Sequence, residues 1–214
     1  MLPERPSAVL NAIAEGGVRK DVQETARAVD DHGTVSSDSV VPAPVEIRSG
    51  YSPGCIGRIG ELHGRYYATA WGSGAAFEVQ MLRELCTFVE EYDHRRDLLL
   101  TAHVADVMIG STVVIGAPES PEARLRWVIV DPRHHGKGAG KAMLAAALAW
   151  CRERQYQTVF LWTVDGLPAS RTMYERAGFR VTARARDTRY SVPLTSLKME
   201  LSLRARSPDI DRDA

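Results

Sequence analysis

The chain has 214 residues, of which 44% are hydrophobic and 25% are charged, and its formal net charge is zero because 27 basic side chains balance 27 acidic ones. This length corresponds to one domain of ordinary size with an appendage, which excludes a multi-domain machine. The composition is that of a globular protein and excludes global disorder. Electroneutrality excludes a bulk attraction to nucleic acid or to an anionic membrane, so any recognition of phosphate must be local.

The two ends of the chain differ from its middle. Several prolines, two adjacent glycines and a polar run interrupt any periodicity in residues 1–44, which predicts a tail or arm with a short helix near 18–29. A second tail is expected at 206–214, which leaves 45–205 as the folded domain. The first residues lack the apolar stretch of a signal peptide, and no run reaches the ~18 apolar residues of a membrane span. We therefore expect a cytoplasmic protein without membrane contact, with three reduced cysteines at positions 55, 86 and 151.

From residue 45 onward the hydrophobic pattern is regular. Ser52 is a suitable N-cap and Pro53 a suitable first residue for the first helix of this region. The order of elements predicts an α/β or α+β fold in which helices flank a mixed sheet. In chain order we expect a strand at 45–48, a helix from 53, a helix at 75–92, a hairpin of strands at 98–103 and 107–115, a strand at 123–130, a helix at 141–154, a strand at 158–164, a helix at 168–177, and strands at 179–186 and 195–203.

The loop after the strand at 123–130 is the most informative segment. Glycines at 136, 138 and 140 separate this strand from a helix, where consecutive backbone N–H groups can approach an anion at the helix N-terminus. Arg133, Lys137 and Lys141 add positive charge at the same place. The pattern predicts a cradle for a phosphate or pyrophosphate. The alternative is a glycine-rich turn with incidental charge.

Two familiar phosphate-binding loops fail on spacing. A Walker loop needs a glycine where His135 stands and a serine or threonine where Ala142 stands. A dinucleotide-binding G-x-G-x-x-G fingerprint needs a glycine where Lys141 stands. NTPase and dehydrogenase functions therefore lose their main support.

Two motifs resemble those of one superfamily. The segment Arg133-His134-His135-Gly136-Lys137-Gly138 resembles the Q/R-x-x-G-x-G/A pyrophosphate-binding motif of the GNAT acyltransferases, which transfer acyl groups from coenzyme A (CoA). Downstream, Met173-Tyr174-Glu175-Arg176-Ala177-Gly178-Phe179 is similar to their L-Y-E-x-x-G-F signature. The order of elements from 45 to 203 also fits the GNAT fold, with its mostly antiparallel sheet. The resemblance implies an N-acetyltransferase that uses acetyl-CoA and an amine acceptor. None of the six histidines shows the spacing of metal ligands, so no metal is expected.

A narrower resemblance involves the segments His63-Gly64-Arg65-Tyr66-Tyr67, Trp71-Gly72, Phe77-Glu78 and Leu161-Trp162-Thr163. They are similar to the acyltransferase half of bacterial proteins in which a MarR-type winged-helix domain precedes a GNAT domain. Only about 44 residues precede the GNAT part here, too few for a winged helix. No nucleic-acid partner is therefore expected.

The resemblance assigns the CoA site to the loop and to the strand before it. It implies that the backbone amides of Arg133 and of residues 136–141 bind the pyrophosphate, and that the strand end faces the pantetheine arm and polarises the acyl carbonyl. The resemblance also implies a coenzyme contact at Ser170, and Leu167 replaces an asparagine that is frequent in the family. For the strand residues, plain sheet core is the alternative. The expected contacts are Val128, Ile129, Val130, Arg133, His135, Gly136, Lys137, Gly138, Ala139, Gly140, Lys141, Ser170 and Tyr174.

The sequence gives a weaker indication of which residues transfer protons. Tyr174 matches the family's tyrosine that protonates the departing thiolate, although a buried aromatic is the alternative. The family's frequent glutamate on the strand before the loop is replaced by Arg124. Glu122 and Glu78 are the candidates for the catalytic base, with a water chain to solvent as the alternative.

Alternation along the same strand puts Arg124 and Arg126 on one face with Val128. Two arginines there predict an acceptor that bears a carboxylate or phosphate, unless they pair with Glu78 or Glu84 of the helix at 75–92. The acceptor class stays open among a small amine, an amino acid and a peptide or protein amine, and the oligomeric state, a homodimer included, is not determined. A regulatory CoA-binding module with little or no turnover is the competing function.

Overall fold

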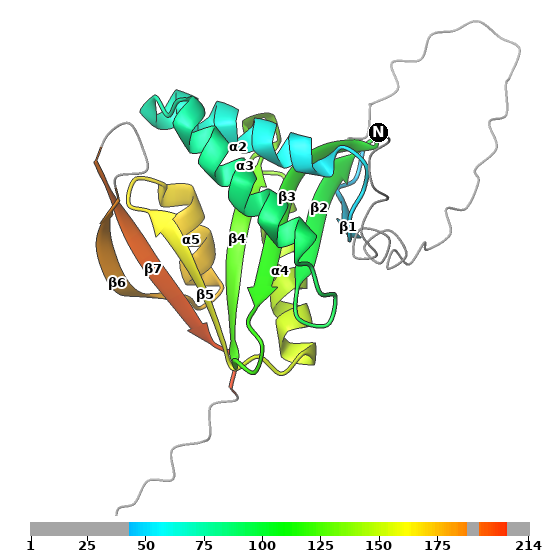
Figure 1. Ribbon diagram of the computed structural model, residues 1–214, viewed down its shortest axis with the longest axis vertical. Helices are drawn as coiled ribbons and strands as arrows, with labels where there is room; N and C mark the ends of the chain where they lie inside the picture. Colours follow the sequence, from blue (N-terminus) through cyan, green and yellow to red (C-terminus); the bar gives the residue numbers. More distant parts are fainter. Residues whose placement is uncertain (1–42, 188–192, 205–214) are drawn as a thin grey trace, which may run out of the picture.

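The computed structural model describes residues 43–187 and 193–204. Its elements follow the predicted order, with one short 3-10 turn added after the fourth strand (Figure 1). They are β1 (Glu46–Ser49), α2 (Cys55–Trp71), α3 (Ala75–Glu90), β2 (Leu98–Val104), β3 (Val107–Gly116), β4 (Glu122–Val130), η1 (Pro132–His134), α4 (Ala139–Glu153), β5 (Thr158–Val164), α5 (Pro168–Arg176), β6 (Arg180–Asp187) and β7 (Leu194–Ser202).

The seven strands form one sheet in the order β1-β2-β3-β4-β5-β7-β6. Within the described residues, every neighbouring pair is antiparallel except β4 with β5. That parallel pair is short, because its register runs only from Glu122 opposite Thr158 to Leu125 opposite Leu161. Beyond Leu125 the two strands no longer pair, and the sheet opens there.

Helices cover both faces of the sheet. In Figure 1, α2 and α3 cross one face and α4 lies behind the other. One side of α3 is apolar, and at its centre Met81, Leu85 and Phe88 are buried. Together with Ile59 of α2 they cover the β2–β4 strands, and each such side chain stabilises the fold by about 1.5–3 kcal/mol through burial.

A β-bulge interrupts β4 at the point where the sheet opens. Val113 of β3 lies opposite Arg126, whereas Ser111 lies opposite Ile129, so Trp127 and Val128 together face a single residue of β3. Trp127 has a φ of 45°, which is rare for a bulky residue. The Ser111 hydroxyl donates a hydrogen bond of 2.7 Å to the Trp127 carbonyl oxygen and holds this conformation.

Several predicted boundaries differ from the structure by one or two residues, among them the start of the first helix. The first helix begins at Cys55 and not at Pro53, because Gly54 adopts a left-handed conformation with φ 87° at the N-cap position. Ser52 instead closes the preceding turn, where its carbonyl oxygen accepts the Cys55 amide at 3.0 Å. The helix predicted near 18–29 and the tail at 206–214 lie outside the described residues. Among the helices that the structure describes, none is both long and apolar enough to cross a bilayer.

Candidate active site

Two cavities meet where β4 and β5 separate. The first, called here the acceptor cavity, lies between α2 and α3 on one side and β5 and α5 on the other. The second, called here the loop cavity, runs along the end of β4, the glycine-rich loop and the start of α4. Four residues line both cavities and mark their junction: Tyr67, Val128, Leu167 and Ser170. A ligand in one cavity can therefore touch a ligand in the other.

The loop cavity ends at an unfilled helix N-terminus. Gly138 is the N-cap residue of α4 with φ 84°, no side chain caps the helix, and its first turn contains no acidic residue. Within the part of the chain that the structure describes, the backbone amides of residues 136–141 donate to no other group. Unpaired amides and the helix dipole together attract an anion, so this end of the cavity suits a pyrophosphate.

Most of the CoA contacts expected from the sequence lie around this cavity. Sequence reasoning missed two tyrosines of α2 and the apolar face of α5, because these elements are distant in the chain and carry no phosphate-binding motif. The lining consists of Tyr66, Tyr67, Val128, Ile129, Val130, His134, His135, Gly136, Gly138, Ala139, Gly140, Lys141, Leu167, Ala169, Ser170 and Met173. Lys137 is exposed beside the cavity, and Tyr174 lines the acceptor cavity.

Arg133 faces away from the loop cavity. Its backbone amide donates to the Asp131 carboxylate at 3.1 Å, and its guanidinium donates to the same carboxylate at 2.7 Å. The backbone amide already donates to a carboxylate and Arg133 does not line the loop cavity, which disagrees with the role expected for this amide. His135 is tethered as well, because its Nε2–H donates to the Val130 carbonyl oxygen at 2.8 Å.

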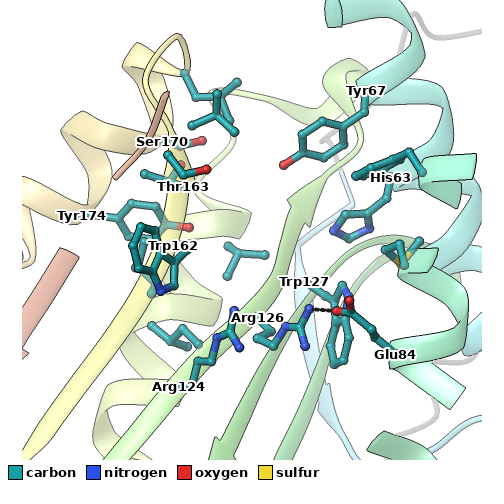
Figure 2. A pocket seen from close by; sticks show the side chains of 18 of the residues that line it. His63, Tyr67, Glu84, Arg124, Arg126, Trp127, Trp162, Thr163, Ser170 and Tyr174 are labelled. Atoms are coloured by element: carbon teal, nitrogen blue, oxygen red, sulfur yellow. Dashed lines mark hydrogen bonds and ion pairs between the residues drawn. The ribbon is translucent and has the colours of Figure 1, made fainter. Parts of the chain in front are cut away.

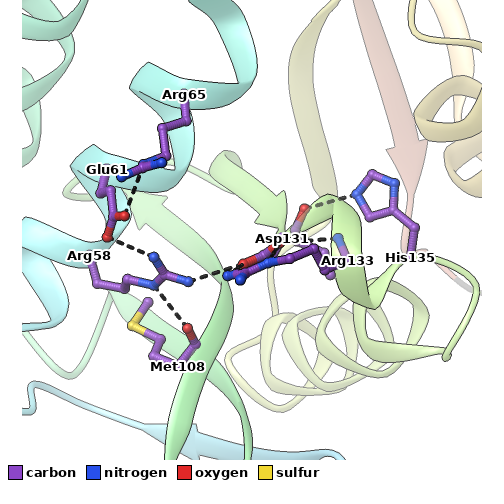
Figure 3. Close-up of polar contacts among 8 residues, drawn as sticks. Arg58, Glu61, Arg65, Met108, Asp131, Arg133 and His135 are labelled. Carbon is purple, nitrogen blue, oxygen red and sulfur yellow. Dashed lines mark hydrogen bonds and ion pairs between the residues drawn. The ribbon is translucent and has the colours of Figure 1, made fainter. Parts of the chain in front are cut away.

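Asp131 anchors the loop to the sheet and to α2 (Figure 3). Its buried carboxylate accepts hydrogen bonds from Arg133 and, at 3.1 Å, from Arg58. Arg58 also donates to the Met108 carbonyl oxygen at 3.0 Å and pairs with Glu61 at 2.6 Å. The hydrogen bonds from Arg133, together with the neighbouring Arg58 charge, hold the pKa of Asp131 well below its usual range.

The acceptor cavity has two walls and a floor of arginines (Figure 2). Tyr174, Trp162, Thr163 and Ser170 lie on one side, and aromatic and polar groups of α2 and α3 lie on the other. Arg124 and Arg126 extend between them from β4, as expected from the alternation along this strand. Arg126 forms an ion pair with Glu84 of α3, and its guanidinium lies 4.3 Å from the centre of the Trp127 ring. The Arg124 guanidinium lies 6.0 Å from the centre of the Phe160 ring.

Tyr174 combines burial with a hydroxyl directed into the cavity (Figure 2). Burial raises the pKa of its phenol above the ordinary value, so the hydroxyl stays protonated at neutral pH. Within residues 43–187 and 193–204, no group forms a hydrogen bond with this hydroxyl. The proton is therefore available to a ligand.

The two carboxylates expected as catalytic bases lie outside both cavities. Glu122 is exposed at the start of β4, at the end where this strand still pairs with β5. Glu78 is exposed on α3 and packs against Gly64 of α2. Glu84 does line the acceptor cavity, but its ion pair with Arg126 occupies it. Neither Glu78 nor Glu122 is retained as a candidate base.

None of the three cysteines lines either cavity. Cys55 and Cys151 are buried in the core and Cys86 is exposed on α3. Burial raises the pKa of the Cys151 thiol to about 12, so it is not a thiolate at neutral pH. The geometry offers no cysteine that could carry an acyl group between the cavities.

Comparisons with known proteins agree with this geometry. Residues 58–179, more than half of the chain, match the family model of the acetyltransferase (GNAT) family. A mycothiol acetyltransferase from Salinispora arenicola is 41% identical over 70 residues, which cover 32% of this chain and 23% of that protein. The matching segment thus spans about a quarter of that curated relative.

Solved structures share the fold. A putative acetyltransferase, yncA from Salmonella typhimurium with acetyl-CoA, has a TM-score of 0.58 and 20% identity and covers 78% of this chain and 98% of its own. Spermidine N-acetyltransferase from Vibrio cholerae, in complex with CoA and spermine, has a TM-score of 0.56 and is 16% identical. The match covers 74% of this chain and 95% of that protein. The predicted fold is confirmed, and the chain belongs to the acetyltransferase (GNAT) family.

Proposed function

We propose that this acyltransferase moves an acetyl group from acetyl-CoA directly to an amine. The observation that carries the proposal is the junction of the two cavities at Tyr67, Val128, Leu167 and Ser170. Acetyl-CoA occupies the loop cavity with its pyrophosphate at the start of α4, and the amine occupies the acceptor cavity. Direct attack needs no acyl-enzyme, which agrees with the absence of a cysteine from either lining.

Tyr174 supplies the proton for the leaving group in this proposal. The departing CoA thiolate needs a proton donor beside it, and burial raises the pKa of the Tyr174 phenol, so this group carries its proton at neutral pH. Tyr174 lines the acceptor cavity one helical turn from Ser170, which lies at the junction. This position agrees with the role that the family resemblance implies.

The acceptor in this proposal carries a carboxylate or phosphate near its amine. Arg124 and Arg126 both line the acceptor cavity, whereas Glu84 is the acid in its lining. The resulting positive charge attracts an anionic group, and it disfavours the ammonium form of an amine relative to the nucleophilic neutral form. Amino acids and peptides with a free N-terminus near an acidic group fit this description, and a polyamine does not.

The test is release of free CoA thiol from acetyl-CoA with a panel of amines: the common amino acids, ethanolamine, spermidine and short peptides. We expect release that depends on the acceptor and is fastest with anionic acceptors. Tyr174→Phe should lower kcat by about 10²–10⁴-fold, the usual contribution of a positioned acid. Binding of CoA, measured by calorimetry, should not change.

Tyr156→Phe is the matched control, because the Tyr156 hydroxyl donates to the Arg96 carbonyl oxygen at 2.9 Å and lines neither cavity. Its kcat should stay near that of the wild type. Tight CoA binding without thiol release from any amine would instead support the regulatory module. Equal rates with anionic and cationic acceptors would contradict the proposed acceptor class.

A further inference from the structure

A buried histidine of α2 lines the acceptor cavity and has no part in the function proposed above. His63 is 5% exposed and lies on the wall opposite Tyr174 and Trp162 (Figure 2). Its Nδ1 atom lies 2.8 Å from the Ile59 carbonyl oxygen, which can only accept a hydrogen bond. The hydrogen of the neutral ring is therefore on Nδ1, and Nε2 carries a lone pair.

The lone pair of His63 is accessible to a ligand. The residue belongs to the lining of the acceptor cavity, and within the described parts of the chain no group donates to Nε2. The ring is held in place by its bond to Ile59 and by the parallel ring of Tyr67, whose centre lies 6.2 Å away with an interplanar angle of 8°. His63 thus lies one helical turn from Tyr67, which is itself at the junction of the cavities.

The surroundings keep His63 uncharged. Burial, and to a smaller extent the positive charge of Arg126, lower its pKa to about 4. The charged groups that line the same cavity are Arg124 and Arg126 from β4 and Glu84 from α3, and Arg126 and Glu84 are paired with each other. A ring that is neutral near pH 7 can accept a hydrogen bond from an amine.

We propose that Nε2 of His63 binds the N–H of the acceptor amine and takes its proton as the amine attacks acetyl-CoA. This inference rests on the proposed function. The amine nitrogen forms a bond to the acyl carbon, the carbon–sulfur bond breaks, and its electron pair stays on sulfur. The N–H proton passes to His63, and the sulfur takes the phenolic proton of Tyr174. The imidazolium then returns its proton to solvent and the phenolate regains one.

A weak base suffices for this step. The nitrogen lone pair becomes part of the new amide, so the attached hydrogen grows strongly acidic as the nitrogen–carbon bond forms. A neutral imidazole at hydrogen-bond distance can take that proton at the end of the attack, even with a lowered pKa. Before the attack, the same hydrogen bond fixes the direction of the nitrogen lone pair.

The experiment compares His63→Gln with His103→Gln in the thiol-release assay. Glutamine keeps a neutral hydrogen-bond acceptor at position 63 but cannot take a proton. His103 is a matched control, because it is equally buried at 5%, both of its ring nitrogens have partners in Thr101 and Asp106, and it lines neither cavity. We expect H63Q to lower kcat by about 10²–10⁴-fold with an unchanged KM for acetyl-CoA, and H103Q to keep the wild-type kcat.

A second measurement does not depend on turnover or on a variant. Nitrogen-15 NMR of the histidine rings in the wild-type protein should show His63 neutral down to pH 5, with its hydrogen on Nδ1 and a shift of Nε2 when an accepted amine binds. A hydrogen on Nε2, or a titration midpoint near 6.5, would overturn the role of His63. So would an active H63Q with wild-type kcat, whereas a wild type that releases no thiol overturns the proposed function itself.

Discussion

At the scale of single residues, a carboxylate positions the glycine-rich loop. Asp131 is buried and accepts hydrogen bonds from the Arg133 backbone, the Arg133 guanidinium and Arg58. It ties the end of β4 to the turn before the glycine-rich loop and to α2 (Figure 3). The basic cluster expected around the pyrophosphate is therefore reduced to Lys137 and Lys141, since Arg133 serves this anchor.

Asp131→Asn should destabilise the protein in a pH-dependent way. The pKa of Asp131 is lowered by folding, so its stabilising contribution is fully present above the pKa of the unfolded chain, near 3.9, and is lost as the pH falls through the lower folded value. At pH 7 the variant should lose about 1.5–3 kcal/mol of unfolding free energy, as expected for hydrogen bonds to a charged group. Urea unfolding of the wild type and of the variant, at pH 7 and at pH 3, measures the free energy of unfolding at each pH.

The matched control is Asp106→Asn, because Asp106 also pairs with an arginine, Arg48, but its side chain is 88% exposed. Solvent screens that pair, so the control should lose less stability than Asp131→Asn. The stability difference between wild type and Asp131→Asn should shrink below pH 4. A difference that is as large at pH 3 as at pH 7 would contradict the assignment.

At the scale of elements, the proposed anion site at the loop and the start of α4 depends on backbone conformation. Gly138 has φ 84° at the N-cap of α4, and a Cβ placed there meets nothing within 4 Å. The glycine is therefore needed for its conformation and not for space. Gly57, in α2, also has open space where a Cβ would lie but has no positive φ, so it provides a direct comparison.

Alanine at these two positions should act in opposite directions. Gly138→Ala should cost about 1–2 kcal/mol, because a left-handed conformation crowds the new Cβ, and should weaken CoA binding. Gly57→Ala should raise stability by about 0.5–1 kcal/mol, because alanine loses less backbone entropy in a helix. Chemical unfolding and calorimetry with CoA test both, and a CoA affinity unaffected by Gly138→Ala would contradict the role of the loop.

The same elements show what the sequence can predict. Periodicity and turn residues predict every strand and helix from β1 to β7, because these signals are local. They do not predict the bulge at Trp127, since it depends on pairing with β3 and on the hydroxyl of Ser111. A sequence identifies charged residues but not their positions in space, and for that reason the sequence alone favours Glu78 and Glu122 as the catalytic base. The orientation of a histidine inside a helix, fixed at His63 by a bond to Ile59, is visible only once the helix is packed.

At the scale of the whole molecule, a neutral protein contains two cavities with different electrostatics. The loop cavity attracts an anion through backbone amides and the α4 dipole, and the acceptor cavity has the two arginines of β4 as its charged floor. The net charge of zero therefore means that acidic residues elsewhere in the chain balance these basic groups. We retain the proposal that residues 45–205 form the catalytic domain, since the sheet, its core and both cavities are built from described residues within that range.

The opening between β4 and β5 has a consequence for inhibition. In the proposed function each substrate has a cavity of its own, so the CoA product should compete with acetyl-CoA for the loop cavity but leave the acceptor cavity open to the amine. Product-inhibition kinetics should give a competitive pattern against acetyl-CoA and a noncompetitive pattern against the amine, with intersecting initial-velocity lines. Parallel lines would indicate an acyl-enzyme instead. A molecule that links CoA to an acidic amine through the junction would gain affinity from both cavities, because the second contact becomes intramolecular once the first is made.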